Sequence, residues 1–133
     1  MANILILGAG SMGTAFSFPC TDNHHVVSIV GTHLENDFID QINSKRKHPA
    51  LNCGVPKSVK FLKFEEIRKE INKKVDLIVV GVISKGIDWA SIELSKVLKS
   101  NIPILILTKG LAINNNNYEV LAHKMERLLK KNG

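Results

Sequence analysis

Three glycines near the amino terminus are spaced as in a turn that binds a diphosphate. The stretch NILILGAGSMGTAF, residues 3 to 16, places five mostly aliphatic residues before Gly8, Gly10 and Gly13, in the pattern G-x-G-x-x-G. Between a strand and a helix, Gly8 permits the tight turn, Gly10 lets the main chain approach a pyrophosphate, and Gly13 lets helix and strand pack closely. The unpaired N–H groups at the start of the helix would face the phosphates. The alternative is a plain strand-to-helix turn.

Thr32 and His33 stand at the expected ribose end of such a site, where the second predicted strand finishes. In the common NAD pattern an acidic residue about 20 positions after the glycines accepts a hydrogen bond from the ribose. Here no carboxylate follows the strand until Glu35. A site without a fixed negative charge can admit the additional phosphate of NADP, with Thr32 or His33 as donor and with Lys45 or Arg46 nearby. The sequence therefore favours NADP but leaves NAD open, and an exposed loop imidazole is the alternative for His33.

A lysine follows the fifth predicted strand. The stretch ILTKGLA, residues 106 to 112, places Lys109 just beyond the carboxyl end of that strand. Ligands of open α/β sheets bind outside this edge, so Lys109 is placed to meet a phosphate or a reacting oxygen. The stretch GVISKG, residues 81 to 86, leaves the fourth predicted strand at the same edge, and we expect Val82 to lie near the nicotinamide half of a dinucleotide. An ordinary surface lysine is the alternative.

The elements that would position these residues alternate between strands and helices. Apolar runs rich in Ile and Val predict strands at residues 3–7, 25–30, 58–62, 75–82 and 102–108. Apolar residues at helical spacing predict helices at residues 12–20, after Thr32 as a possible N-cap, around 64–71, around 89–98, and from 118 to 131. Because parallel neighbours need crossover connections, this order predicts an α/β fold, a Rossmann-type doubly wound parallel sheet covered on both faces.

Three further local features are expected from the sequence. Pro19 removes a backbone donor and crowds the carbonyl of Ala15, so the first helix should end or kink there. Residues 45–57 are read as a loop, because Pro49, Gly54 and Pro56 punctuate them. The run NNNN at residues 114–117 is read as a flexible loop.

Length and composition limit the classes of protein. With 133 residues, 44% hydrophobic and 23% charged, the chain has room for one globular domain, and we expect residues 1–133 to be an NAD(P)-binding domain. No apolar run reaches the ~18 residues that a membrane span needs. The first basic residue is Lys45, so the amino terminus lacks the charged region of a signal peptide. A cytoplasmic protein without membrane contacts is therefore expected.

Charge and cysteine usage narrow the partners. The formal net charge of the chain is +6, and the positive charge is concentrated in residues 45–74, which contain ten Lys and Arg but only three Glu. A phosphate-bearing small ligand explains this excess with fewer assumptions than nucleic acid, since aromatic residues are few and no nucleic-acid motif is recognised. Cys20 and Cys53 stand far apart without a metal-ligand pattern, so both are read as free thiols and no metal site is expected.

The stretches ILGAGSMGTAFS, VGTHLEN, VDLIVVGV and ILTKGLA together resemble, in order, the amino-terminal half of NAD(P)-dependent glycerol-3-phosphate dehydrogenases. Residues 8–15 meet the family pattern G-A-G-x-x-G-T-A, and residues 108–111 meet its T-K-G-L. The segment from VGTHLEN to SKRKHPALN resembles archaeal members more than bacterial ones. The resemblance implies hydride transfer between dihydroxyacetone phosphate and sn-glycerol 3-phosphate.

The resemblance also assigns roles to individual residues. It implies that Ser11 and Met12 line the cofactor phosphates and that Thr32 lies at the adenosine ribose. Lys109 would contact both the cofactor and the substrate, which makes it the candidate catalytic residue. Met12 stands where many members have an aromatic residue. The helical domain that supplies the family's catalytic lysine and most of its substrate pocket has no counterpart here.

Three interpretations follow from this departure. The chain is the dinucleotide domain of a dehydrogenase whose helical part is a separate polypeptide or is missing. Alternatively, it is a stand-alone NAD(P)-binding module without turnover. The third interpretation is an interaction protein that associates with itself through the apolar face left by the helical domain.

Overall fold

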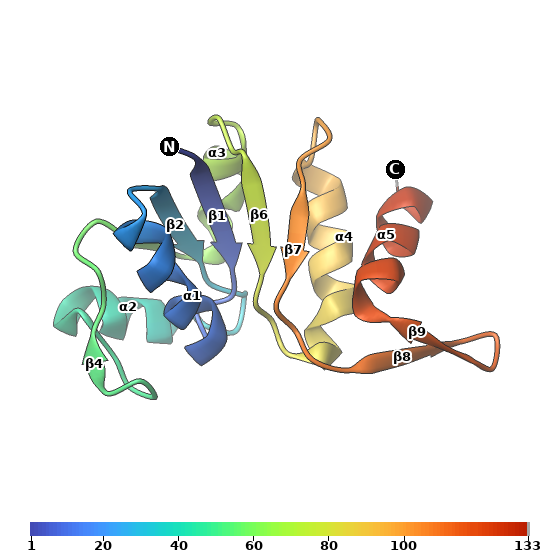
Figure 1. The fold of residues 1–133 in the computed structure, drawn as a ribbon, viewed down its shortest axis with the longest axis horizontal. Coiled ribbons are helices and arrows are strands. Elements are labelled where there is room, and N and C mark those ends of the chain that lie inside the picture. The colour runs from blue at the N-terminus through green and yellow to red at the C-terminus, as the bar shows by residue number, and fades with distance from the viewer. Residues whose placement is uncertain (133) are drawn as a thin grey trace.

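Five parallel strands form the central sheet of the computed structural model, which describes residues 1–132 (Figure 1). The strand order β5-β2-β1-β6-β7 confirms the predicted α/β fold with a doubly wound sheet. The sheet consists of β1 (Asn3–Leu7), β2 (Val26–Val30), β5 (Lys60–Leu62), β6 (Leu77–Val80) and β7 (Ile104–Ile106).

The carboxyl ends of the three middle strands lie at one level. Leu7 at the end of β1 pairs with Val30 of β2 on one side and with Val80 of β6 on the other. The next residue of each strand is a glycine, so Gly8, Gly31 and Gly81 leave the sheet side by side. This edge of the sheet, at the bottom of Figure 1, is where the predicted site residues follow their strands.

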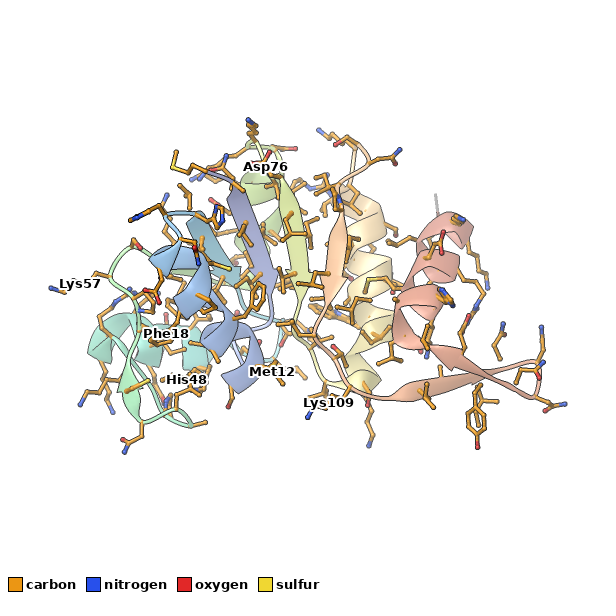
Figure 2. All side chains as sticks on the ribbon, in the orientation of Figure 1. Met12, Phe18, His48, Lys57, Asp76 and Lys109 are labelled. Carbon is orange, nitrogen blue, oxygen red and sulfur yellow. The ribbon has the colours of Figure 1, made fainter. Side chains whose placement is uncertain are left out.

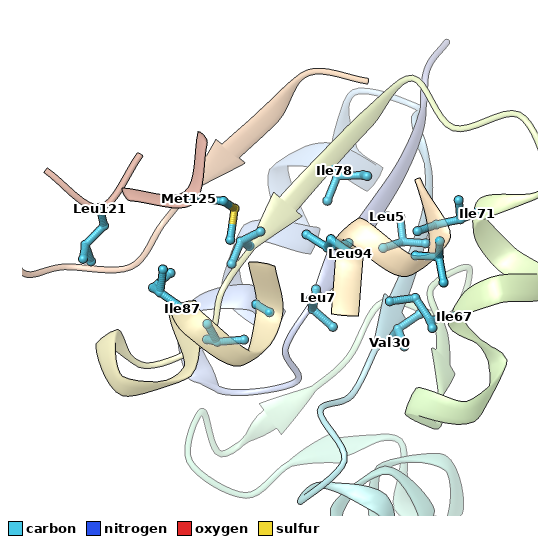
Figure 3. Packing of buried hydrophobic residues seen from close by; sticks show 14 residues of the cluster. Leu5, Leu7, Val30, Ile67, Ile71, Ile78, Ile87, Leu94, Leu121 and Met125 are labelled. Carbon is cyan, nitrogen blue, oxygen red and sulfur yellow. The ribbon is translucent and has the colours of Figure 1, made fainter. Parts of the chain in front are cut away.

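Helices cover both faces of the sheet. The helices are α1 (Ser11–Asp22), α2 (Asn36–Lys45), α3 (Ile67–Ile71), α4 (Ile87–Val97) and α5 (Leu121–Lys131), with short 3-10 turns η1 (Phe64–Glu66) before α3 and η2 (Ser84–Gly86) before α4. Alternate strand residues point to opposite faces. Leu5, Leu7 and Ile78 pack with α3, α4 and α5 (Figure 3), whereas Ile4 and Ile6 belong to a second cluster with α2.

Helix α1 does not end at Pro19, so the expected end of the helix there is wrong. The helix continues to Asp22, and the N–H and side-chain amide of Asn23 both donate to the carbonyl of Pro19. A proline removes only its own donor, and the residues after it keep theirs. Buried packing of Ser17 and Cys20 holds the surrounding turns against the sheet.

The asparagine run is a tight turn rather than a flexible loop. It joins β8 (Leu111–Asn114) to β9 (Asn117–Val120) in an antiparallel hairpin, and Asn115 and Asn116 have φ values of 51° and 65°. Asparagine tolerates this left-handed conformation, which two-residue hairpin turns require. The last helix accordingly begins at Leu121, after Tyr118. Residues 45–57 likewise contain a small hairpin, β3 (Lys47–His48) with β4 (Cys53–Gly54).

None of the helices within residues 1–132 is long and apolar enough to cross a membrane. Over the same range, no three His, Cys, Asp or Glu side chains are grouped as metal ligands would be. Both cysteines are free thiols, with Cys20 buried and Cys53 exposed.

Candidate dinucleotide site

The first and third glycines of the motif are required by backbone packing. Gly8 has a φ of +112°, and a Cβ atom there would lie 2.8 Å from the carbonyl oxygen of Gly81. A Cβ atom on Gly13 would lie 2.5 Å from the carbonyl oxygen of Gly8. Both positions therefore exclude any larger residue without movement of the backbone. The turn and the start of α1 are held as close together as the glycine pattern predicts.

Gly10 differs from the other two glycines. No atom lies within 4 Å of the position that its Cβ would take, and its φ of −70° is one that any residue can adopt. The protein itself therefore does not need glycine here. A ligand that approaches the main chain is a reason for glycine at such a position. Helix α1 begins at the next residue, Ser11, so its first N–H groups lie beside this open space.

Two cavities at this edge share residues and make one cleft. A cavity of about 400 Å³ lies beside the end of β2, and one of about 310 Å³ lies beside the end of β7. The residues common to both are Gly10, Gly81, Val82 and Ile83. Of the predicted site residues, the first cavity is lined by Gly8, Gly10, Thr32, His33 and Val82, and the second by Gly10, Ser11, Met12, Val82 and Lys109; Gly13 lines neither.

Lys109 lies at the mouth of the second cavity, close to Met12 (Figure 2). The hydroxyl of Thr108 donates a hydrogen bond to the carbonyl of Val82, which joins the ends of β6 and β7. Gly110 has a φ of +136° and turns the chain away directly after the lysine. The side chain of Lys109 is exposed and forms no ion pair with any residue from 1 to 132.

The side chain of Glu35 places a carboxylate beside the end of β2, where the sequence predicts none. Its Oε1 atom accepts hydrogen bonds from the N–H of Thr32 at 2.8 Å and from the N–H of Ala9 at 3.1 Å. The expectation that this end of the site lacks a fixed negative charge is therefore wrong. The residue is four positions beyond Gly31 in the sequence, but the chain folds back and returns the carboxylate to the glycine turn.

The same turn corrects the predicted start of α2. Glu35, not Thr32, is the residue that precedes the helix, and the Oγ1 atom of Thr32 accepts a weak hydrogen bond at 3.4 Å from the N–H of Leu34. Leu34 is 83% exposed and lies outside the helix. It lines the first cavity instead.

The two basic residues expected near the ribose do not line the cleft. The Nη2 atom of Arg46 donates to the backbone carbonyls of Pro56 at 2.8 Å and Val59 at 3.1 Å. Its guanidinium carbon also lies 5.4 Å from the ring centre of Phe61. Arg46 therefore closes the loop after α2, and neither it nor Lys45 belongs to either cavity.

His48 supports the glycine turn from a distant part of the sequence. The imidazole is 1% exposed. Its Nδ1 atom accepts from the N–H of Ala50 at 3.1 Å, so the ring proton is on Nε2, which donates to the carbonyl of Ala9 at 3.0 Å. Together with Glu35, His48 holds both backbone groups of Ala9. Its contact spans 39 residues of sequence, and no local pattern in residues 45–57 signals it.

Aromatic rings form one wall of the first cavity. The ring of His33 lies 4.6 Å from that of Trp89, which in turn lies 4.8 Å from Phe64. His33 is exposed but packed on this indole rather than free in solvent. Glu35 is the one carboxylate and Lys85 the one lysine among the residues that line this cavity.

Comparison with known proteins identifies relatives among the glycerol-3-phosphate dehydrogenases. A glycerol-3-phosphate dehydrogenase [NAD(P)+] of Bacillus pumilus is 34% identical over 113 residues, which are 84% of this chain and 31% of that protein. An NADP(+)-dependent glycerol-3-phosphate dehydrogenase of Archaeoglobus fulgidus is 29% identical over 125 residues, 94% of this chain and 36% of that one. The chain thus spans about a third of the length of these relatives.

Solved structures agree at the level of the fold. The crystal structure of glycerol-3-phosphate dehydrogenase from Coxiella burnetii superposes with a TM-score of 0.81 at 22% identity, over 96% of this chain and 38% of that chain. The ternary structure of D-mandelate dehydrogenase with NADH gives a TM-score of 0.66 at 19% identity, over 97% of this chain and 36% of that one.

The family model described as NAD-dependent glycerol-3-phosphate dehydrogenase N-terminus matches residues 3–133. This match confirms the resemblance found in the sequence and, with it, the expected cofactor class of NAD or NADP. The closer resemblance to archaeal members stays a prediction, because bacterial and archaeal relatives both match. The chain belongs to the family of NAD-dependent glycerol-3-phosphate dehydrogenases, as their amino-terminal part.

Proposed function

We propose that residues 1–133 form a domain that binds NAD or NADP along the cleft and serves a glycerol-3-phosphate dehydrogenase. The observation that carries this proposal is the contrast among the three glycines. Backbone atoms of the protein occupy the space where a Cβ atom of Gly8 or Gly13 would lie. No protein atom lies within 4 Å of the corresponding position at Gly10. An open space beside the first N–H groups of α1 has the shape and polarity that a pyrophosphate requires.

The two cavities divide the dinucleotide between them. The pyrophosphate lies over Gly10 and is bound by the N–H groups of Ser11 and Met12. The adenosine occupies the cavity walled by His33 and Trp89, because the ribose follows the end of the second strand in this fold. The nicotinamide then occupies the cavity between Val82 and Lys109, at the end of β7. Gly8 shapes the turn and lines the first cavity, whereas Gly13 contributes by shaping the turn alone.

The proposed reaction is hydride transfer between the nicotinamide and a phosphorylated three-carbon substrate. The bound dinucleotide supplies or accepts the hydride. Reduction of a carbonyl also needs a proton donor at the oxygen, and orientation of a phosphorylated substrate needs a cation. Lys109 is the lysine that lines the second cavity, so it is the residue of this chain that contacts the substrate phosphate or hydroxyl. The rest of the substrate pocket would come from the part of a dehydrogenase that these residues do not span.

Titration with NADH and NADPH tests the binding proposal. Trp89 is the only tryptophan of the chain and lines the first cavity, so quenching of its fluorescence reports occupancy. Gly10→Val should abolish binding while the circular dichroism spectrum stays that of the wild type, because the new side chain meets no protein atom within 4 Å of its Cβ. Gly54→Val, at an exposed site away from the cleft, is the matched control. Undiminished affinity in Gly10→Val would show that the cofactor lies elsewhere.

A second assay separates the enzyme from a binding module. Reduction of dihydroxyacetone phosphate is measured with the purified chain, and again after an equimolar helical domain from a relative is added. Turnover that depends on the added domain and is lost in Lys109→Met supports a split dehydrogenase. Turnover by the chain alone contradicts the role assigned to the helical domain. Binding without turnover in either case favours the module.

The second candidate function, a module that pairs with a second copy of itself, is favoured by the β8–β9 hairpin. Leu111 lies opposite Val120 and Ile113 opposite Tyr118, so all four apolar side chains share one face of the hairpin. Each is exposed, Ile113 by 73% and Tyr118 by 81%. Such a face can pair with itself across a two-fold axis. Sedimentation equilibrium should then show a dimer that Ile113→Ser dissociates and Ile92→Ser, on α4, does not.

A further inference from the structure

We propose that Glu35 selects the cofactor: its carboxylate accepts the adenosine ribose hydroxyls and repels a 2′-phosphate, so that the cleft prefers NAD to NADP. This inference rests on the proposed function, since it assumes that the first cavity holds the adenosine. It reverses the preference that the sequence alone favours, because that preference depended on the absence of a carboxylate.

The hydrogen bonds of Glu35 hold the carboxylate where a ribose would lie. The N–H of Thr32 belongs to the end of β2, and the N–H of Ala9 belongs to the glycine turn. One oxygen atom, Oε1, accepts from both and so bridges the two segments that flank an adenosine ribose in this fold. An acid directly after the strand does this in the common NAD pattern. Here Glu35 reaches the same place from the start of α2.

The other oxygen of the carboxylate is left for a ligand. No residue from 1 to 132 donates a hydrogen bond to the Oε2 atom of Glu35. An ionised carboxylate accepts through both oxygens, about four lone pairs in all, so Oε2 retains its full capacity. Glu35 is half-buried and lines the first cavity. A ribose with free 2′ and 3′ hydroxyls supplies the donors that this oxygen lacks, whereas a 2′-phosphate supplies none.

Gly31 makes room for this arrangement. A Cβ atom at Gly31 would lie 3.3 Å from the Cβ of Glu35 and 2.9 Å from the Cγ1 of Ile39. Any side chain at this position would therefore press on the turn that returns the carboxylate to the site. The close approach shows that the returning turn is packed against the end of β2.

The charges that face the ribose oppose one another, and Glu35 decides their balance. Lys85 lines the same cavity and would attract a 2′-phosphate, and the His33 ring, which also lines it, can donate a hydrogen bond to such a phosphate. Glu35 is the carboxylate that offsets them there. Removing its charge leaves two groups that favour NADP and none that disfavours it. The preference should therefore change sign with this one side chain.

The test compares NADH with NADPH by quenching of Trp89 in the wild type and in Glu35→Gln. The amide oxygen of glutamine can still accept from Thr32 and Ala9, so the turn is kept while the charge is lost. We expect the wild type to prefer NADH and the variant to bind NADPH about tenfold more tightly than the wild type does, the order of magnitude for like charges a few ångströms apart. Its affinity for NADH should fall by about tenfold, because the amide nitrogen that replaces Oε2 cannot accept from the ribose hydroxyls.

A control and three outcomes complete the test. Glu126→Gln removes the same charge from an exposed position on α5 and should leave both affinities unchanged. Binding of neither dinucleotide by the wild type overturns the proposed function and this inference together. A wild type that prefers NADPH overturns the inference alone, even if the variant does not fold. An NADPH-to-NADH affinity ratio in Glu35→Gln equal to that of the wild type also overturns it, since a purely structural role would not move the ratio.

Discussion

Two regions of the molecule differ in how far their residues are buried. One is the inner sheet, formed by β1, β2 and β6, and the other is the outer segment, residues 104–120. Ile6, Ile29 and Val80 of the inner sheet are 0% exposed. Not one residue of β7, β8 or β9 in the outer segment is buried. The inner strands have a neighbour on each side and helices over both faces, whereas β7 is an edge strand and the hairpin extends beyond it (Figure 1). The glycine turn is therefore held by its own packing, while the segment around Lys109 is bordered by apolar surface that this chain does not cover.

The largest difference is expected between two isoleucines. Ile78 of β6 is 0% exposed, and Ile113 of the hairpin is 73% exposed. Ile78→Ala should lower the free energy of unfolding by about 4 kcal/mol, because it leaves a cavity in the core. Ile113→Ala should change it by less than about 0.5 kcal/mol. Urea denaturation measures both. Comparable losses in the two variants would mean that the hairpin is covered in solution and that the comparison is wrong.

The next largest difference in stability is expected between two glycines of the motif that follows β1. Gly13→Ala places a Cβ atom 2.5 Å from a backbone oxygen, so the turn must move, and we expect a loss of about 3 kcal/mol. Gly10→Ala meets no atom within 4 Å and should cost less than about 1 kcal/mol, the remaining cost being that alanine is a poorer N-cap of α1 than glycine. Thermal or urea unfolding of the two variants decides this. A stable Gly13→Ala would show that α1 is not held against the turn as tightly as described.

A smaller effect is expected for the histidine that supports the turn. His48→Ala removes the donor to the carbonyl of Ala9 and the acceptor for the N–H of Ala50, all in a buried position, and should cost about 2 kcal/mol. His123→Ala, at an exposed position on α5, should be nearly neutral. Dinucleotide affinity should also fall in His48→Ala, because the glycine turn loses one of its two supports. Unchanged stability would remove His48 from the description of the site.

The smallest effect is expected in the pH dependence of stability. Burial alone would raise the pKa of Glu70, but hydrogen bonds and charges from Lys73, Ser28 and Lys60 outweigh burial, so the pKa lies below its usual value. A carboxyl whose pKa is lowered by folding stabilises the protein above its unfolded pKa of about 4.3, and that contribution is lost as the pH falls further.

Stability curves at pH 7 and pH 3.5 measure the contribution of Glu70. The free energy of unfolding of Glu70→Gln should fall less between these pH values than that of the wild type, by about 1 kcal/mol. Glu126→Gln is the comparison from the exposed surface, where Lys130 lowers the pKa of a carboxylate that solvent screens. If the Glu126 substitution had a larger effect on the pH dependence than the Glu70 substitution, the greater burial of Glu70 would not be what makes its charge matter for stability.

Regular structure was predictable wherever local pattern and packing agree. The strands at Asn3–Leu7 and Leu77–Val80 are apolar runs that become fully enclosed, so composition alone indicates them. The glycine spacing likewise predicted which end of the sheet carries the cleft. The hairpin at Asn115 and Asn116 was missed because a polar run reads as a loop unless the positive φ of asparagine is considered.

The support of the site was not predictable, because it depends on long-range contacts. Glu35 reaches Ala9 across 26 residues of sequence, and His48 reaches it across 39. A charge count placed Arg46 near the ligand, but three backbone carbonyls, those of Pro56, Lys57 and Val59, accept from its guanidinium. Which partner a polar side chain finds is decided by the fold and not by its neighbours in the chain.

The hydrogen bond from Thr108 to the carbonyl of Val82 has a mechanical consequence. It joins the end of β7 to the end of β6 beside the second cavity. Thr108 directly precedes Lys109, and Val82 directly follows Gly81. The two strand ends therefore cannot separate independently, and a displacement of one is transmitted to the other. A ligand bound on the glycine side of the cleft would therefore be coupled to Lys109 through this side-chain hydrogen bond and through the backbone hydrogen bond from the N–H of Leu107 to the carbonyl of Val80.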